Sequence, residues 1–288
     1  MSDLRRQIDP VDVARFRDLA LALADEARRR IRGFWDHGFE VKKKPDGSYV
    51  TSADLDVEQR QREMIEAACP DHGILGEEYA PRLPDAEFQW ILDPVDGTEE
   101  FVQRLPTFST VIALFYRGEP IVGVIEAPIL AERAHAAFGL GAFHGDARLR
   151  LTDLDTATPA KAVRIMLSAR LNFVRNRDDG AIFDAITRAF PNHRIYRSSY
   201  THLCAAAGQV DAMVDVGNVI WDIAAARILV EEAGGACRVV QDYVSGPERI
   251  ISLVFGRPSV VERLAAFLRP SHLPRSRHQA RRCSRRSR

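Results

Sequence analysis

The chain has 288 residues, of which 46% are hydrophobic and 28% are charged. This composition is typical of a folded globular protein, and it excludes a low-complexity or intrinsically disordered chain. The formal net charge of zero is unevenly distributed, because residues 269–288 contain eight arginines and no acidic residue, which leaves residues 1–268 with about −8 by difference.

The sequence contains no apolar run of the roughly 20 residues that span a bilayer, and its first residues lack the apolar stretch of a secretory signal. We therefore expect a cytoplasmic protein with no membrane partner. The cysteines lie far apart without a CxxC pair, so neither a zinc site nor a disulfide framework is indicated. We expect free thiols, the first three of them buried or half-buried: Cys69, Cys204, Cys237 and Cys283.

The first half of the chain predicts two helices packed against a largely antiparallel sheet. Apolar residues recur every three or four positions from Pro10 to Trp35, which predicts the first helix. A turn-rich loop, KKKPDGSY, precedes a second helix from about Ala53 to Ala68. Strands are predicted, the last two joined as a hairpin, at Gln89–Leu92, Ser109–Tyr116 and Pro120–Glu126.

After Arg150 strands and helices alternate, which is typical of a layered α/β structure. The strands are predicted near residues 163–167, 194–196, 211–214, 237–240 and 251–255. The helices are predicted near residues 181–189, 203–207 and 221–233, with a last helix that ends at Leu268. We accordingly divide the chain into a metal-binding α+β half (1–150), an α/β half that completes the site (151–268) and a basic tail (269–288).

The basic tail has almost nothing apolar to bury and is expected to be disordered. A solvated extension without a specific partner is the favoured interpretation. Binding of nucleic acid, or of a membrane surface, by the arginines is the alternative that its charge leaves open.

Acidic residues are concentrated in the segment ILDPVDGTEEF, residues 91–101. Pro94 cannot continue a strand ladder, so the chain is predicted to turn there and to direct Asp93 and Asp96 into the same space. Gly97 and Thr98 offer amides at the predicted start of a short helix, 99–103, where an anion binds. Two carboxylates beside an anion site require cations, and hard oxygen ligands without His or Cys indicate magnesium.

Two further segments place carboxylates in similar settings. Glu77 and Glu78 follow the apolar pair Ile74-Leu75, and Asp222 lies at the start of a helix in WDIAAARILVEEAGG, where its charge suits the helix dipole. Each acid taken alone is explained as simply by a helix cap or a turn. Their combination favours a metal site.

GEE, DPVDGTEEF and WDIAAARILVEEAGG together resemble the signature segments of the inositol monophosphatase family, over about residues 10–268. Members of that family are magnesium-dependent, lithium-sensitive phosphomonoesterases. The resemblance implies a five-layered αβαβα sandwich of the α/β class, usually a homodimer. It also implies hydrolysis of a small phosphorylated substrate with two or three Mg²⁺ per site.

The resemblance assigns roles to individual residues. Glu77 and Thr98 would position and deprotonate the attacking water, with Asp54 polarising Thr98. The metal ligands would be Glu77, Asp93, the Val95 carbonyl, Asp96 and Asp222. The substrate would contact Lys44, Asp96, the amides of Gly97 and Thr98, Ser198 and Asp215.

The substrate itself is less well defined by sequence. Residues 196–200 read YRSSY where inositol-cleaving members have Gly-Ser/Thr-Ala, and Asp215 stands where they have Glu. These features resemble histidinol-phosphatase members, although those carry Gly-Asp where Arg197-Ser198 stand. Histidinol phosphate is slightly favoured over inositol monophosphate. The alternatives are a 3′-phosphoadenosine 5′-phosphate or sugar bisphosphate phosphatase, because DGTEEF resembles the DGTKEF of nucleotide 3′-phosphatase members, and a non-catalytic interaction protein of the same fold.

Overall fold

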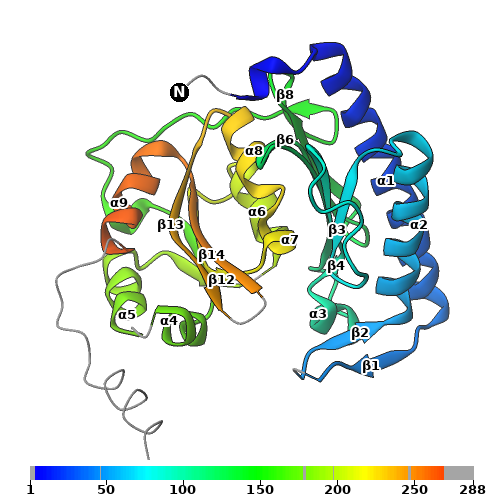
Figure 1. Cartoon of the computed structure of the whole chain (residues 1–288). Helices are drawn as coiled ribbons and strands as arrows, with labels where there is room; N and C mark the ends of the chain where they lie inside the picture. The colour runs from blue at the N-terminus through cyan, green and yellow to red at the C-terminus, as the bar shows by residue number, and fades with distance from the viewer. Residues whose placement is uncertain (1–3, 46, 178–179, 197, 246–247, 269–288) are drawn as a thin grey trace, which may run out of the picture.

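The computed structural model describes residues 4–45, 47–177, 180–196, 198–245 and 248–268. A seven-stranded sheet and a five-stranded sheet face each other across a central layer of helices, and further helices cover both outer faces (Figure 1). This confirms the predicted five-layered αβαβα sandwich. The prediction of a disordered tail at 269–288, with Cys283, falls outside the described residues.

Two antiparallel helices form the outer layer on the seven-stranded sheet (Figure 1). α1 (Pro10–His37) begins at the N-cap Asp9, whose side chain accepts a 2.8 Å hydrogen bond from the Val11 amide. α2 (Ser52–Ala68) begins after Thr51, and a short antiparallel pair, β1 (Val41–Lys43) and β2 (Tyr49–Thr51), precedes it. Both predicted helices are confirmed, and the apolar residues of each helix pack on the sheet.

The seven-stranded sheet has the order β3-β4-β5-β6-β7-β8-β9, and only β3 and β4 run parallel. The three predicted strands are confirmed as β4, β5 and β6, whereas β3 and β7–β9 were not predicted. The sequences of β7–β9, such as ERAHAA, are poor in β-branched residues. The strands are β3 (Gly73–Gly76), β4 (Phe88–Asp96), β5 (Ser109–Tyr116), β6 (Glu119–Ala127), β7 (Glu132–Ala137), β8 (Gly141–His144) and β9 (Ala147–Arg148).

The five-stranded sheet has the order β11-β10-β12-β14-β13, parallel on the β11 side and antiparallel on the β13 side. The helices α4 (Arg170–Arg177), α5 (Gly180–Ala189) and α9 (Pro258–Leu268) cover its outer face (Figure 1). The strands confirm the predicted alternation: β10 (Ile165–Leu167), β11 (His193–Ile195), β12 (Ala212–Asn218), β13 (Ala236–Ser245) and β14 (Glu248–Gly256).

The central layer consists of α6 (Ser199–Ala206), α7 (Ile220–Ile223) and α8 (Ala226–Glu232). The predicted single helix over 221–233 is divided into α7 and α8 by a turn at residues 224–225, although the backbone of Ala224 and Ala225 stays in the right-handed helical region. The break falls where Ala225 approaches the sheet: a Cβ added to Gly123 of β6 would lie 3.1 Å from Ala225 Cα and 2.5 Å from Ile228 Cγ2. The spacing of apolar residues along the sequence does not indicate such a contact with a distant strand.

Free thiols were predicted, and the structure confirms this for the three described cysteines. Cys69 and Cys204 are buried, and Cys237 is half-buried. None of the described helices is both long enough and apolar enough to cross a membrane.

The contact at Gly123 predicts a stability difference between two glycine substitutions. Gly123→Ala should lower the free energy of unfolding by about 1–3 kcal/mol, because the added methyl overpacks the interface between β6 and α8. Gly33→Ala is the control, because Gly33 lies inside α1 with open space where the added methyl would lie. It should be neutral or stabilising by up to about 1 kcal/mol. Urea unfolding measures both, and equal effects would contradict the close packing of these layers.

Candidate functional site

Asp93 and Asp96 lie at the carboxyl end of β4, on either side of a register shift with β5. Residues three apart in a regular strand point to opposite faces, and the irregular stretch around Pro94 removes that alternation. The Pro94 carbonyl accepts a 2.7 Å bond from Thr110 Oγ1, and the Val95 amide donates to Asp93 Oδ1 at 3.1 Å. The predicted turn at Pro94 is therefore wrong: the strand continues, and a bulge brings the two carboxylates to one side.

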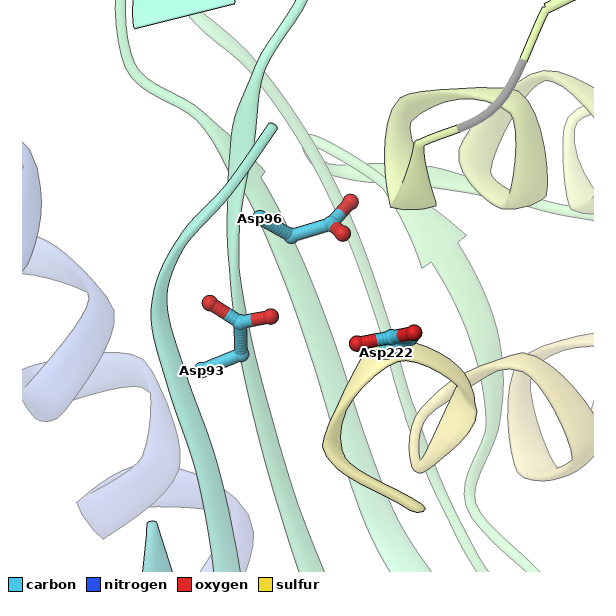
Figure 2. Close-up of side chains that lie close together, drawn as sticks. All are labelled: Asp93, Asp96 and Asp222. Carbon is cyan, nitrogen blue, oxygen red and sulfur yellow. The ribbon is translucent and has the colours of Figure 1, made fainter. Parts of the chain in front are cut away.

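Asp222 reaches the same space from the other half of the molecule. It lies in the first turn of α7, where its carboxylate accepts a hydrogen bond from the Val219 amide at 3.4 Å. Figure 2 shows Asp93 and Asp96 of β4 and Asp222 of α7 pointing toward one another. One oxygen atom of each carboxylate lies within 4.8 Å of the others. Oxygen ligands of one hard cation are at most about 4–5 Å apart, so this spacing suits a shared ion.

Glu77 follows β3 and adds a fourth carboxylate. Lys44, in the loop after β1, donates to Glu77 Oε1 at 2.9 Å and to Glu78 Oε1 at 2.8 Å. Burial opposes the charge of Lys44, but the two glutamates raise its pKa overall, so the amine stays protonated. Burial raises the pKa of Glu77, and it raises that of Glu78 to about 7. The loop that carries Lys44 is thus held to the site by charge.

Thr98 begins α3 (Thr98–Val102), directly after Gly97, whose φ of +91° favours glycine. Its Oγ1 lies 3.1 Å from the Val95 carbonyl and 3.3 Å from Asp54 Oδ1. Asp54 is fully buried on α2 and accepts a 2.9 Å bond from the Thr51 amide. Burial raises the pKa of Asp54, although the hydrogen bonds from Thr51 lower it. The structure therefore brings together Thr98 and Asp54, which the sequence analysis paired.

The first turn of α6 contacts the site from the side of the five-stranded sheet. The Ser199 amide donates to Asp96 Oδ2, and the Ser199 and Ser109 hydroxyl oxygens lie 2.6 Å apart. Ser198 is 4% exposed, and its hydroxyl donates to the Thr107 carbonyl at 3.1 Å. Its predicted contact with substrate stays a prediction.

Asp215 lies deeper than the other predicted substrate residues. It is 1% exposed, and its Oδ2 accepts a 2.7 Å hydrogen bond from His202 Nε2. It is not among the described residues that line the cavity above the carboxylates. Its contact with substrate also stays a prediction.

A cavity of about 510 Å³ opens over the carboxylates, a volume that suits a small ligand. Lys44 and Asp54 adjoin it through their bonds to Glu77 and Thr98. The described residues that line it are Gly47, Ser48, Tyr49, Glu77, Asp93, Val95, Asp96, Gly97, Thr98, Glu99, Glu100 and Asp222.

The strongest electrostatic conflict in the site is at Asp93, which is 1% exposed. Burial raises the pKa of Asp93 well above its usual value, and the charges of Glu77, Asp96 and Asp222 raise it further. A divalent cation among these carboxylates would offset their repulsion. The donors are hard oxygens, so the residues present fit Mg²⁺, the metal that the sequence analysis predicted.

Sequence reasoning missed the buried support behind Glu77. Glu58 of α2 is fully buried and accepts 2.8 Å bonds from Arg62 Nε and from the Glu78 amide. A Cβ on Gly76 would lie 2.1 Å from Glu58 Oε1, so the glycine lets this carboxylate reach the end of β3. The signal in the sequence is an acid and an arginine four residues apart on the apolar face of α2.

Comparison with known proteins agrees with this geometry. The model of the inositol monophosphatase family matches residues 9–254. The chain is 36% identical over 245 residues to a histidinol-phosphatase of Mycobacterium tuberculosis, covering 80% of this chain and 88% of that protein. It is 36% identical over 268 residues to the Nus factor SuhB of Pasteurella multocida, covering 87% and 96%.

Solved structures show the same fold. The inositol monophosphatase of Anabaena superposes with a TM-score of 0.74 at 27% sequence identity. The match covers 89% of this chain and 96% of that one.

The crowding of carboxylates predicts how stability depends on pH when metal is removed. Because burial and its neighbours raise the pKa of Asp93 in the folded state, the contribution of Asp93 to stability is fully present below its unfolded-state pKa of about 4 and is lost as the pH rises through the raised pKa. In EDTA, the melting temperature should therefore fall as the pH rises from about 4 through the raised pKa of Asp93. Asp93→Asn should flatten this fall and melt higher than the unmodified protein at pH 8. Scanning fluorimetry measures both, and parallel curves would contradict the assignment of the repulsion to Asp93.

Proposed function

The chain belongs to the inositol monophosphatase family and is a phosphoric monoester hydrolase, and we propose that it removes phosphate from histidinol phosphate with the help of Mg²⁺. The observation that carries this proposal is the convergence of Asp93, Asp96 and Asp222 under a cavity of small-ligand size. Glu77 and Val95 line the same cavity, and the Glu77 carboxylate and the Val95 carbonyl complete the proposed ligand set.

The proposed chemistry needs no covalent intermediate with the protein. Bound Mg²⁺ would supply Lewis acidity and positive charge for the phosphate oxygens. The Gly97 and Thr98 amides, at the amino end of α3, would hold the phosphate. The short distances from Thr98 Oγ1 to Asp54 and to the Val95 carbonyl favour donation of its proton away from the cavity. The Thr98 oxygen is then free to accept a hydrogen bond from an attacking water that Glu77 orients, and as that water gives up its proton to Thr98 Oγ1, the hydroxyl proton of Thr98 would pass to Asp54 Oδ1.

Two observations support histidinol phosphate as the substrate. Glu99 and Glu100 line the cavity in addition to the proposed metal ligands. Histidinol carries an amine that is cationic at neutral pH, whereas inositol is a neutral polyol, so an acidic rim favours histidinol as the leaving group. In addition, relatives from Mycobacterium tuberculosis and Chlorobaculum parvum are named histidinol-phosphatases. Inositol monophosphate is the second candidate substrate.

A role in protein interaction is the alternative function. It is supported by the similarity to proteins named Nus factor SuhB, one of them 36% identical to this chain. An interaction role alone does not require the convergence of Glu77, Asp93, Asp96 and Asp222, or the Thr98–Asp54 contact. The site therefore favours catalysis.

Phosphate release from a substrate panel tests the proposal. With Mg²⁺, kcat/KM should be highest for histidinol phosphate, followed by inositol 1-phosphate, and lower for 3′-phosphoadenosine 5′-phosphate and fructose 1,6-bisphosphate. EDTA or Asp93→Asn should reduce turnover at least tenfold, because each weakens a cation site that the reaction needs. A preference for inositol 1-phosphate would overturn the substrate assignment. Equal turnover in EDTA would overturn the role of the metal, and no release from any phosphate would favour the interaction role.

A further inference from the structure

His202 and Asp215 form a buried pair behind the carboxylate site. His202 Nε2 lies 2.7 Å from Asp215 Oδ2, and each residue is 1% exposed. The His202 ring packs edge-on against Phe255 of β14, with ring centroids 5.0 Å apart. His202 Nδ1 is buried and has no hydrogen-bond partner in the described part of the chain. Burying an imidazole with one nitrogen unsatisfied is costly, so stability alone is a weak reason for this pair.

Each partner belongs to an element that leads to a proposed metal ligand. His202 lies on α6, one helical turn after Ser199, whose amide donates to Asp96 Oδ2. Asp215 is the last residue of β12 in regular register with β14 before the shift that ends at Asn218. The chain then enters α7, and Asp222 follows Asp215 by seven residues. The pair therefore connects the helix that contacts Asp96 to the strand that leads to Asp222.

This connection spans the two halves of the molecule. Asp96 belongs to the seven-stranded sheet, whereas α6, β12 and Asp222 follow it in the second half of the chain. Ser199, in the first turn of α6, connects the two halves, because it is hydrogen-bonded to Asp96 and Ser109 of the seven-stranded sheet. The bond between His202 and Asp215 then joins α6 directly to β12, the strand that leads into α7.

We propose that His202 is a positioning residue that holds Asp96 and Asp222 at a separation that suits Mg²⁺. This inference rests on the proposed function, which identifies the cation as Mg²⁺. The role of His202 is not part of that proposed function. The inference also gives Asp215 a role that needs no contact with substrate. Groups that hydrogen-bond to metal ligands, as the Ser199 amide does to Asp96, typically change the metal affinity by about 10–100-fold when they are lost, and His202 would act by holding the helix that carries this amide.

Calorimetric titration of the full-length protein with Mg²⁺, without substrate, tests this role. His202→Leu should weaken Mg²⁺ binding at least tenfold, because the donor to Asp215 is lost. His202→Gln should stay within about threefold of the unmodified protein, because its side-chain amide offers a donor of similar reach. Asp211→Asn is the matched control. Asp211 is a buried acid at the opposite end of β12, 2% exposed and bonded to Arg164 and Arg257. Its replacement should lower the melting temperature and leave Mg²⁺ binding unchanged.

A double variant separates positioning from stability. His202→Leu with Asp215→Leu removes both partners, so no buried carboxylate is left without its donor and much of the melting temperature should return. If Mg²⁺ binding stays at least tenfold weaker while the melting temperature recovers, His202 acts by positioning. If Mg²⁺ binding recovers with the melting temperature, or is unchanged in His202→Leu, the inference is overturned. Absence of Mg²⁺ binding by the unmodified protein would overturn the proposed function, and this inference with it.

Discussion

Asp93, Asp96 and Asp222 repel one another at the base of an open cavity, and the architecture around them holds them together against that repulsion. Asp93 is almost fully buried, and the neighbouring carboxylates add to the effect of burial in raising its pKa. Lys44 offsets part of the charge through Glu77 and Glu78. A divalent cation bound among these carboxylates would relieve repulsion that the fold already enforces.

The two halves of the chain position their carboxylates in this site by different local structures. In the seven-stranded sheet, the bulge around Pro94 brings Asp93 and Asp96 to one face, and the Thr98 hydroxyl lies over the Val95 carbonyl. In the other half, the chain passes from the end of β12 into α7, and Asp222 lies in the first turn of that helix. The site is complete only when the central helices pack between the two sheets, as Figure 1 shows. Packing at places such as Gly123 therefore has consequences for chemistry as well as stability.

Local signals in the sequence predicted most of the helices and strands and singled out the carboxylates, whereas the five layers and the roles of the proposed ligands were implied by the family resemblance. Helical periodicity in α1, strand patterns in β5 and β6, and acids beside Pro94 and Trp221 are all readable from neighbouring residues. Three features depend on contacts between distant segments: the bulge at Pro94, the break between α7 and α8, and the hydrogen bond from the Glu78 amide to Glu58. The partner of Asp215 was missed for the same reason, since His202 comes from another element and nothing in its local sequence marks it.

Direct location of the cation is the measurement closest to the central claim. Crystals of the unmodified protein soaked in Mn²⁺, a scattering substitute for Mg²⁺ with the same preference for oxygen ligands, would be measured at the manganese absorption edge. We predict an anomalous peak between the carboxylates of Asp93, Asp96 and Asp222, with oxygen ligands at about 2.0–2.3 Å. A well-occupied peak elsewhere, with none among these three aspartates, would contradict the account.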